Sequence, residues 1–198
     1  EPGMSAAIAA TATGDYRDLE TVRAFARDVD VITFDHEHVP QEVLRALVDD
    51  GVAVHPGPDA LFYAQDKLRM RARLAELGMP QPEWAAISDA AGLQAFLDDN
   101  GGRAVVKTPR GGYDGKGVRV VRSADDAADW LDALQPGGQL LVEELVEFTR
   151  ELAQQVARRP SGAWRSYPVV ETVQRDGVCA EVIAPAPRAG QRLIEVAE

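Results

Sequence analysis

The chain has 198 residues, which is enough for one large domain or two small ones. Its composition, with 45% hydrophobic and 27% charged residues, is typical of a globular protein, and no stretch of 18 apolar residues predicts a membrane span. The net charge of −11 argues against nonspecific nucleic-acid binding, which needs a basic surface. The single cysteine, Cys179, excludes an internal disulfide, and the first residues lack the basic and apolar regions of a signal peptide, so we expect a cytoplasmic protein.

An acidic protein can bind a phosphorylated ligand only where cations are concentrated locally, so the distribution of lysine is informative. Three of the 21 basic residues are lysines, namely Lys67, Lys107 and Lys116. Where arginine is the usual basic residue, a lysine indicates a position that favours a compact, flexible ammonium group.

The first part of the chain alternates helices and strands as an open α/β domain does. Apolar spacing predicts a helix over residues 19–27, a buried strand over 30–34, a helix over 40–49 with proline in its first turn, and a short strand over 52–55. We interpret this segment as the end of such a domain, and expect its first strands and any phosphate loop to precede residue 1. Residues 59–77 are predicted to be helical, with a break near Asp66.

The rest of the chain favours a mixed α+β structure. Strands are predicted over residues 84–87, 103–107, 118–121 and 140–145, and the second and third of them form a hairpin-like unit. Ser88 is expected to cap a helix through residue 100, and Ser123 with Asp126 to cap a helix to residue 134. Alternating patterns predict antiparallel strands at 151–158, 164–169 and 178–184, and residues 191–198 are predicted to begin a helix.

The glycine-rich loop RGGYDGKG at residues 110–117 is the strongest local signal for function. Four glycines between two β-branched strands would let backbone amides approach phosphate oxygens closely. No serine or threonine follows the Gly-Lys pair, so the loop is not a Walker A motif, and no helix follows directly, so it is not a dinucleotide fingerprint. Taken alone, the loop could equally be a glycine-rich hairpin turn.

Charged residues around this loop favour a nucleotide site. Lys107 ends the preceding strand and could reach nucleotide phosphates as a point charge. Glu143 and Glu144 stand at the end of a later strand, which could offer backbone groups and a carboxylate to adenine, and Glu151 could accept ribose hydroxyls. Each glutamate taken alone is more simply interpreted as a solvated surface charge.

The order of these features resembles the ATP-grasp superfamily, in which two α+β lobes clasp ATP between antiparallel sheets. Five segments are similar to the N5-carboxyaminoimidazole ribonucleotide synthetase family within it: KTPRGGYDGKG, VITFDHEHVP, HPGPDALFYAQDKLRMR, VEELVEFTRELA and YPVVETVQRDG. The resemblance implies α/β and α+β parts. Residues 1–56 would be the end of an open α/β (pre-ATP-grasp) domain, 57–82 linker helices, and 83–198 the central lobe and the start of the C-terminal lobe of a truncated ATP-grasp domain.

The resemblance also implies roles for individual residues. Contacts to ATP are implied for Lys67, Lys107, Gly112, Tyr113, Asp114, Gly115, Lys116, Gly117, Val118, Glu143, Glu144, Leu145, Val146, Glu151 and Gln174. Tyr113, Asp114 and Lys116 would also be catalytic and, with Glu37, would face the aminoimidazole ribonucleotide. Gln174 stands where the family often has histidine, and Thr172 where asparagine is common, so the role of that strand stays open.

The activity that the resemblance implies is ATP-dependent carboxylation of 5-aminoimidazole ribonucleotide with bicarbonate, through carboxyphosphate, in purine biosynthesis. The implied ligands are ATP, Mg²⁺ and these small molecules, in a homodimer that binds neither nucleic acid nor membrane. The metal ligands are expected beyond residue 198 and none within the chain, so the 198 residues alone are expected to be inactive. The alternatives are another ATP-grasp ligase, such as formate-dependent glycinamide ribonucleotide transformylase or biotin carboxylase, and a noncatalytic nucleotide-binding module.

Two further features have simpler interpretations. The run Asp35, His36, Glu37, His38 contains possible metal ligands, but on a strand alternate residues point to opposite faces, and no third group of ligands is evident. A metal is therefore disfavoured there. Cys179 is interpreted as a small strand hydrophobe and not as a nucleophile.

Overall fold

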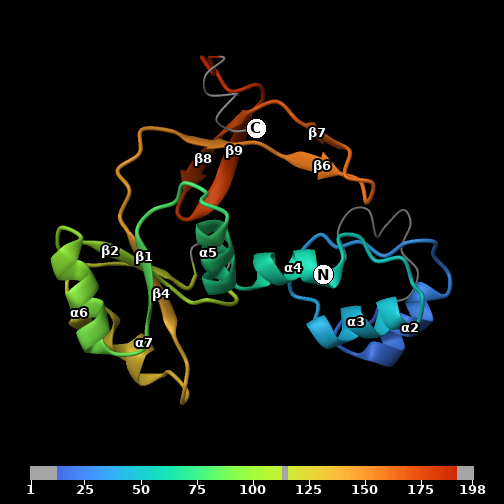
Figure 1. Ribbon diagram of the computed structural model, residues 1–198, viewed down its shortest axis with the longest axis horizontal. Coiled ribbons are helices and arrows are strands. Elements are labelled where there is room, and N and C mark those ends of the chain that lie inside the picture. The colour runs from blue at the N-terminus through green and yellow to red at the C-terminus, as the bar shows by residue number, and fades with distance from the viewer. Residues whose placement is uncertain (1–12, 113–115, 191–198) are drawn as a thin grey trace. The chain divides into compact units, whose positions relative to one another are not determined.

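The structure, a computed structural model, describes residues 13–112 and 116–190 (Figure 1). The chain divides into two compact units, the first formed by residues 1–81 with 109–111 and the second by residues 82–108 with 112–198. Each unit has a hydrophobic core of its own. Within the described ranges, no helix is long and apolar enough to cross a bilayer.

The first unit contains four helices among its described residues: α2 (Leu19–Ala26), α3 (Gln41–Asp49), α4 (Pro58–Gln65) and α5 (Lys67–Glu76). Asp18 begins α2 by accepting a hydrogen bond from the backbone N of Thr21 at 3.0 Å, and Pro58 stands in the first turn of α4. Asp66 separates α4 from α5 in an extended conformation. The predicted helices and the predicted break are therefore confirmed.

The strands predicted for the first unit are largely wrong. Among the described residues, segments 30–34 and 52–55 form a single parallel bridge between Ile32 and Val54. Two backbone hydrogen bonds support it, from Ile32 N to Ala53 O at 2.8 Å and from His55 N to Ile32 O at 2.9 Å. Ile32 and Val54 are buried as predicted, and pack with residues of α3 such as Leu44 and Leu47, but a one-residue ladder is too short to count as a strand.

The second unit is built on an antiparallel sheet with the strand order β1-β4-β2-β3. Its strands are β1 (Trp84–Ile87), β2 (Ala104–Lys107), β3 (Val118–Val121) and β4 (Leu140–Glu144), close to the predicted ranges. One face packs into a core that includes Leu93, Leu97 and Val106. The predicted hairpin is confirmed, because β2 and β3 pair with Lys107 opposite Val118 and so enclose the glycine-rich loop.

Helices α6 (Ala90–Asp99) and α7 (Ala128–Asp132), the latter preceded by the 3₁₀ turn η1 (Ala124–Ala127), flank this sheet (Figure 1). The N-cap of α6 is Asp89, which accepts from the backbone N of Gly92 at 2.8 Å, so the prediction of Ser88 was wrong by one residue. The predicted capping box of Ser123 and Asp126 is confirmed. The helix after it starts as a 3₁₀ turn and ends at Asp132, two residues earlier than predicted.

The last described segment contains a three-stranded sheet, β5-β8-β9, and a two-stranded hairpin, β6-β7. The bounds are β5 (Glu151–Ala153), β6 (Val156–Arg158), β7 (Trp164–Ser166), β8 (Val170–Arg175) and β9 (Val178–Ile183). The predicted strand 151–158 is thus two strands in different sheets, and β8 was missed. Cys179 lies on strand β9, as predicted, but its side chain is exposed, so it does not pack as a buried hydrophobic residue. The helix predicted over 191–198 lies outside the described residues.

Candidate functional site

The base of the glycine-rich loop is closed by close backbone contacts in the second unit. Thr108 N donates to Gly117 O at 3.0 Å, which extends the β2–β3 ladder by one step. Gly112 and Gly117 have φ angles of +76° and +74°. A Cβ on Gly112 would lie 2.4 Å from Lys116 O, and one on Gly117 would lie 2.5 Å from Thr108 Oγ1. Both positions therefore favour glycine for conformation, and Gly112 also needs it for space, because its Cβ would meet a backbone atom whereas that of Gly117 would meet a side chain.

The loop residues differ in how far the structure describes them. Tyr113, Asp114 and Gly115, all predicted to contact ligands, lie outside the described residues. Lys116 and Val118 are exposed at the start of the returning strand. The structure thus places the two ends of the predicted flap and leaves the role of its centre a prediction.

Lys107 and Glu143 meet on one face of the sheet. They lie on neighbouring strands β2 and β4, with Lys107 opposite Leu141 and Glu143 opposite Val105, so their side chains are diagonal neighbours. The ammonium of Lys107 forms an ion pair with the carboxylate of Glu143. The Glu143 side chain is 4% exposed, whereas that of Lys107 is 26% exposed. The interpretation of Glu143 as a solvated surface charge was therefore wrong.

The residues that follow Glu143, namely the last residue of β4 and the segment after it, are more accessible than Glu143. Glu144 is exposed, and its backbone N donates to Glu83 O at 2.8 Å beside β1. Leu145 is half-buried and Val146 is exposed. The end of strand β4 and the residues after it offer backbone polar groups together with apolar surface, which is the combination that a purine base needs.

Glu151 is held by two side chains of the neighbouring strand. It lies on β5 opposite Thr172 of β8, and its Oε1 accepts from Thr172 Oγ1 and, at 2.6 Å, from Gln174 Nε2. These hydrogen bonds, that of Thr172 first, lower the pKa of Glu151 below its ordinary value. The sequence left the roles of Thr172 and Gln174 open. In the structure both hold the carboxylate and favour its ionised form.

The predicted site residues of the first unit are Lys67 and Glu37. Lys67 Nζ donates to the carbonyl oxygen of Gly111 at 2.9 Å. Glu37 lies in a bend that borders a cavity of about 330 Å³, together with Arg110 and Gln65. Sequence reasoning singled out neither Arg110 nor Gln65. Two features of the sequence could have identified them. Arg110 directly precedes the glycine pair, and Gln65 is next to the helix break at Asp66.

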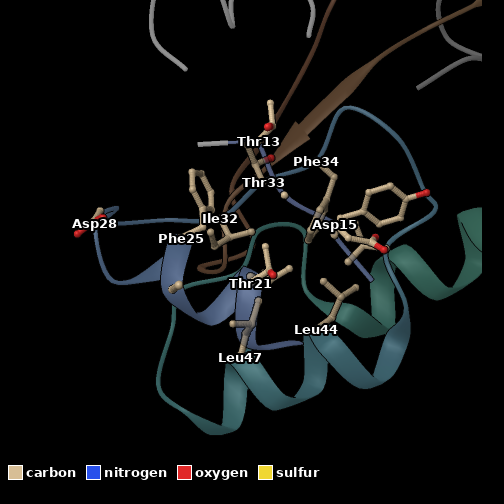
Figure 2. A pocket seen from close by; sticks show the side chains of 15 residues that line it. Thr13, Asp15, Thr21, Phe25, Asp28, Ile32, Thr33, Phe34, Leu44 and Leu47 are labelled. Carbon is tan, nitrogen blue, oxygen red and sulfur yellow. The ribbon is translucent and has the colours of Figure 1, made fainter. Parts of the chain in front are cut away.

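A second cavity in the first unit has a different character. Its volume is about 540 Å³, and Figure 2 shows Phe25, Ile32, Phe34, Leu44 and Leu47 among the side chains around it. This lining is mostly apolar, which makes it unsuited to a phosphate or a carboxylate.

The acidic and histidine-rich run at residues 35–38 is a bend and not a strand, so the alternation argument used against a metal site there was wrong. The rings of His36 and His38 are neighbours, with centroids 5.2 Å apart. Even so, the described part of the chain contains no group of three or more histidine, cysteine, aspartate or glutamate side chains placed to hold a metal ion.

Family comparisons cover both parts of the chain. The ATP-grasp domain family matches residues 72–198, and the ribonucleotide synthetase preATP-grasp domain family matches residues 2–65. A Mycobacterium bovis protein named N5-carboxyaminoimidazole ribonucleotide synthase is 51% identical over 175 residues, which are 88% of this chain and 41% of that protein.

Two solved structures show the same fold. The N5-carboxyaminoimidazole ribonucleotide synthetase from Thermus thermophilus has a TM-score of 0.81 and 32% identity, covering 93% of this chain and 49% of that one. The N5-carboxyaminoimidazole synthase from Aspergillus clavatus, in complex with ADP and 5-aminoimidazole ribonucleotide, has a TM-score of 0.80 and 28% identity, covering 95% and 48%. This chain thus spans less than half the length of these three relatives. It belongs to the ATP-grasp family, with a pre-ATP-grasp segment before its ATP-grasp domain.

Proposed function

We propose that the protein containing this chain is a ligase that uses ATP and bicarbonate to carboxylate 5-aminoimidazole ribonucleotide in purine biosynthesis. The observation that carries the proposal is a loop whose base is formed by Gly112 and Gly117 and which follows Lys107 closely in the chain. The relatives of this chain bear the name of this enzyme. A loop of this kind can cover phosphates with its backbone amides, and the ion pair with Glu143 holds Lys107 at its base.

Each part of the nucleotide would be bound by a different segment of the chain. Lys67 and Lys107 would neutralise phosphate charge, the loop from Gly112 to Val118 would cover the phosphates, and the chain from Glu143 to Val146 would hold adenine. Glu151 would accept the ribose hydroxyls, because Thr172 and Gln174 donate to one of its oxygens and favour the charged form. Since Glu143 is occupied by Lys107, its backbone and the residues after it would supply most of the adenine contacts.

The nucleotide substrate would lie against Glu37 and the flap residues Tyr113, Asp114 and Lys116. We also propose the domain division at residues 1–56, 57–82 and 83–198, supported by helices α4 and α5, which occupy the intervening stretch of sequence. The Mg²⁺ that the family resemblance implies would supply neutralisation of phosphoryl charge, and among the described residues no group of three or more histidine, cysteine, aspartate or glutamate side chains is placed to hold it.

Bicarbonate is a poor electrophile and must be activated first. One of its oxygens would attack the γ-phosphorus of ATP as the bond to the β–γ bridging oxygen breaks, which gives ADP and carboxyphosphate. Carboxyphosphate would then break down to carbon dioxide and inorganic phosphate. The exocyclic amine of the aminoimidazole nucleotide would attack the carbon dioxide and lose a proton. The protein would position the reactants and neutralise charge, and the closed flap would keep water from the labile intermediate.

The test is ADP formation by the complete protein with ATP, Mg²⁺ and bicarbonate, with and without 5-aminoimidazole ribonucleotide. We expect ADP release that depends on this nucleotide. ADP release that depends on glycinamide ribonucleotide and formate, or on biotin, would assign a different ATP-grasp ligase. Nucleotide binding without turnover under any of these conditions would indicate a noncatalytic module.

Three further properties are part of the proposal. The complete protein would be a cytoplasmic homodimer, as the family resemblance implies, which sedimentation of the purified protein would test. The 198 residues alone, which span 41% of the length of the Mycobacterium bovis relative, would bind nucleotide but lack turnover. Bicarbonate-dependent turnover by the isolated chain would refute this last expectation.

A further inference from the structure

The loop that contains Glu37 is held by two glutamine side chains of the first unit. Gln65, the last residue of α4, donates from Nε2 to the carbonyl oxygens of Glu37 at 2.7 Å and Val39 at 2.6 Å. Gln41 Nε2 donates in turn to Gln65 Oε1 at 2.9 Å and to Pro58 O at 3.0 Å, which orients the Gln65 amide. One side chain thus binds the backbone on either side of residue 38.

The next two residues of the chain hold the start of the glycine-rich flap. Asp66, which is 8% exposed, accepts from Arg110 Nε at 3.0 Å. Lys67 donates from its backbone N to Pro109 O at 2.9 Å and from Nζ to Gly111 O at 2.9 Å. Each residue of the flap root, defined as residues 109–111, is therefore bonded to Asp66 or Lys67.

Both held segments border one cavity, which residues 37–42 line together with Gln65, Arg110 and Gly111. We propose that Gln65, Asp66 and Arg110 are positioning residues: the junction of α4 and α5 fixes the flap root and the Glu37 loop relative to each other. The inference rests on the proposed function, in which these two segments carry residues that face the aminoimidazole ribonucleotide.

The physical reason is pre-organisation. The positive φ angle of Gly111, +66°, is a conformation that glycine adopts and leaves easily, so the flap root has little stiffness of its own. Bonds from Asp66 and Lys67 restrict it before substrate arrives, which lowers the ordering cost on binding. A small displacement of reacting groups can cost about 100-fold in rate, so loss of this restraint is expected to reduce catalysis.

Asp66→Asn separates this role from helix capping. Asp66 also caps α5 by accepting from Arg69 N at 3.1 Å, and asparagine caps about as well as aspartate, so the substitution removes mainly the charge facing Arg110. The matched control is Asp89→Asn. Asp89 caps α6 through Gly92 N at 2.8 Å, and within the described ranges it forms no ion pair.

The experiment uses the complete protein and measures steady-state kinetics, Tm and amide hydrogen exchange over residues 108–112. We expect Asp66→Asn to lower kcat/KM for 5-aminoimidazole ribonucleotide about tenfold or more, to speed exchange at the flap root, and to shift Tm no more than Asp89→Asn does. Asp66→Glu, which keeps the charge, should recover part of the loss. Kinetics and exchange equal to those of Asp89→Asn would overturn the inference. If the wild-type protein shows no turnover with this nucleotide, the proposed function fails, and the exchange comparison alone decides whether the restraint exists.

Discussion

The ammonium of Lys107 and the carboxylate of Glu143 form an ion pair across neighbouring strands of the central sheet, yet the two groups are unequally buried. The side chain of Glu143 is 4% exposed and that of Lys107 is 26% exposed. A buried charge that loses its partner is costly, whereas a partly exposed ammonium can turn toward water. The carboxylate therefore depends on the lysine more than the lysine depends on the carboxylate.

This asymmetry predicts unequal costs for the two single substitutions. We expect Lys107→Met to lower the free energy of unfolding by about 3 kcal/mol, because it removes the cationic partner of a buried carboxylate. Glu143→Gln should cost about 1 kcal/mol, since it removes the buried charge and keeps a polar group of the same shape. Urea denaturation of the two variants and of the double variant measures these differences. Equal costs, or additive costs in the double variant, would contradict the pairing.

The sheet that carries this pair follows from sequence patterns, because its strands are short apolar segments bounded by turn residues. The starts of α2, α4, α5 and α6, which carry aspartate caps or proline, have a local signal of the same kind, although Asp89 and Ser88 are equally good caps by composition. At residues 30–34 and 52–55 the local pattern did not predict the structure correctly. A strand forms only where a neighbouring segment pairs with it, and a single segment does not specify that partner. The pattern there predicts burial correctly and pairing incorrectly.

The hydrogen-bonded surroundings of Glu151 predict a specific pH response. The Thr172 hydroxyl and the Gln174 amide lower the pKa of Glu151, so its folded-state pKa lies below the unfolded value near 4.5. The corresponding stability is present above the unfolded pKa and is lost as the pH falls through the folded pKa. Thr172→Val should raise the pKa of Glu151 toward 4.5, as followed by carboxyl NMR titration. Thr172→Ser keeps the hydroxyl and serves as the control, and an unchanged pKa in Thr172→Val would refute this cause.

Adjacent glycines in the flap predict different effects of the same substitution. Gly111 and Gly112 both have positive φ, but a Cβ on Gly111 meets nothing within 4 Å, whereas one on Gly112 would lie 2.4 Å from Lys116 O. We expect Gly111→Ala to cost about 1–2 kcal/mol from backbone strain alone. Gly112→Ala should cost about 1–3 kcal/mol more, because the clash is with backbone. Urea denaturation compares them, and equal costs would show that the loop base is looser than described.

The candidate site could be predicted only in part, for a reason visible at Asp66 and Thr172. The sequence places lysines, glycines and glutamates in an informative order, but it does not show which side chain each one meets. Asp66 looks like a helix break, and its bond to Arg110 joins residues 44 positions apart. Thr172 looks like a departure from the family pattern until β8 pairs with β5 and places its hydroxyl on Glu151. Long-range pairing of this kind is fixed by the fold and not by local patterns.

Isotope transfer can show whether the carboxylation proceeds through an activated bicarbonate. The complete protein would be incubated with ATP, Mg²⁺, 5-aminoimidazole ribonucleotide and bicarbonate labelled with ¹⁸O, and the inorganic phosphate analysed by mass spectrometry. Attack of a bicarbonate oxygen on the γ-phosphorus predicts one ¹⁸O atom per phosphate released, dependent on the aminoimidazole nucleotide. Unlabelled phosphate formed at the same rate as ADP would mean that bicarbonate is not phosphorylated, and would refute the proposed carboxyphosphate step.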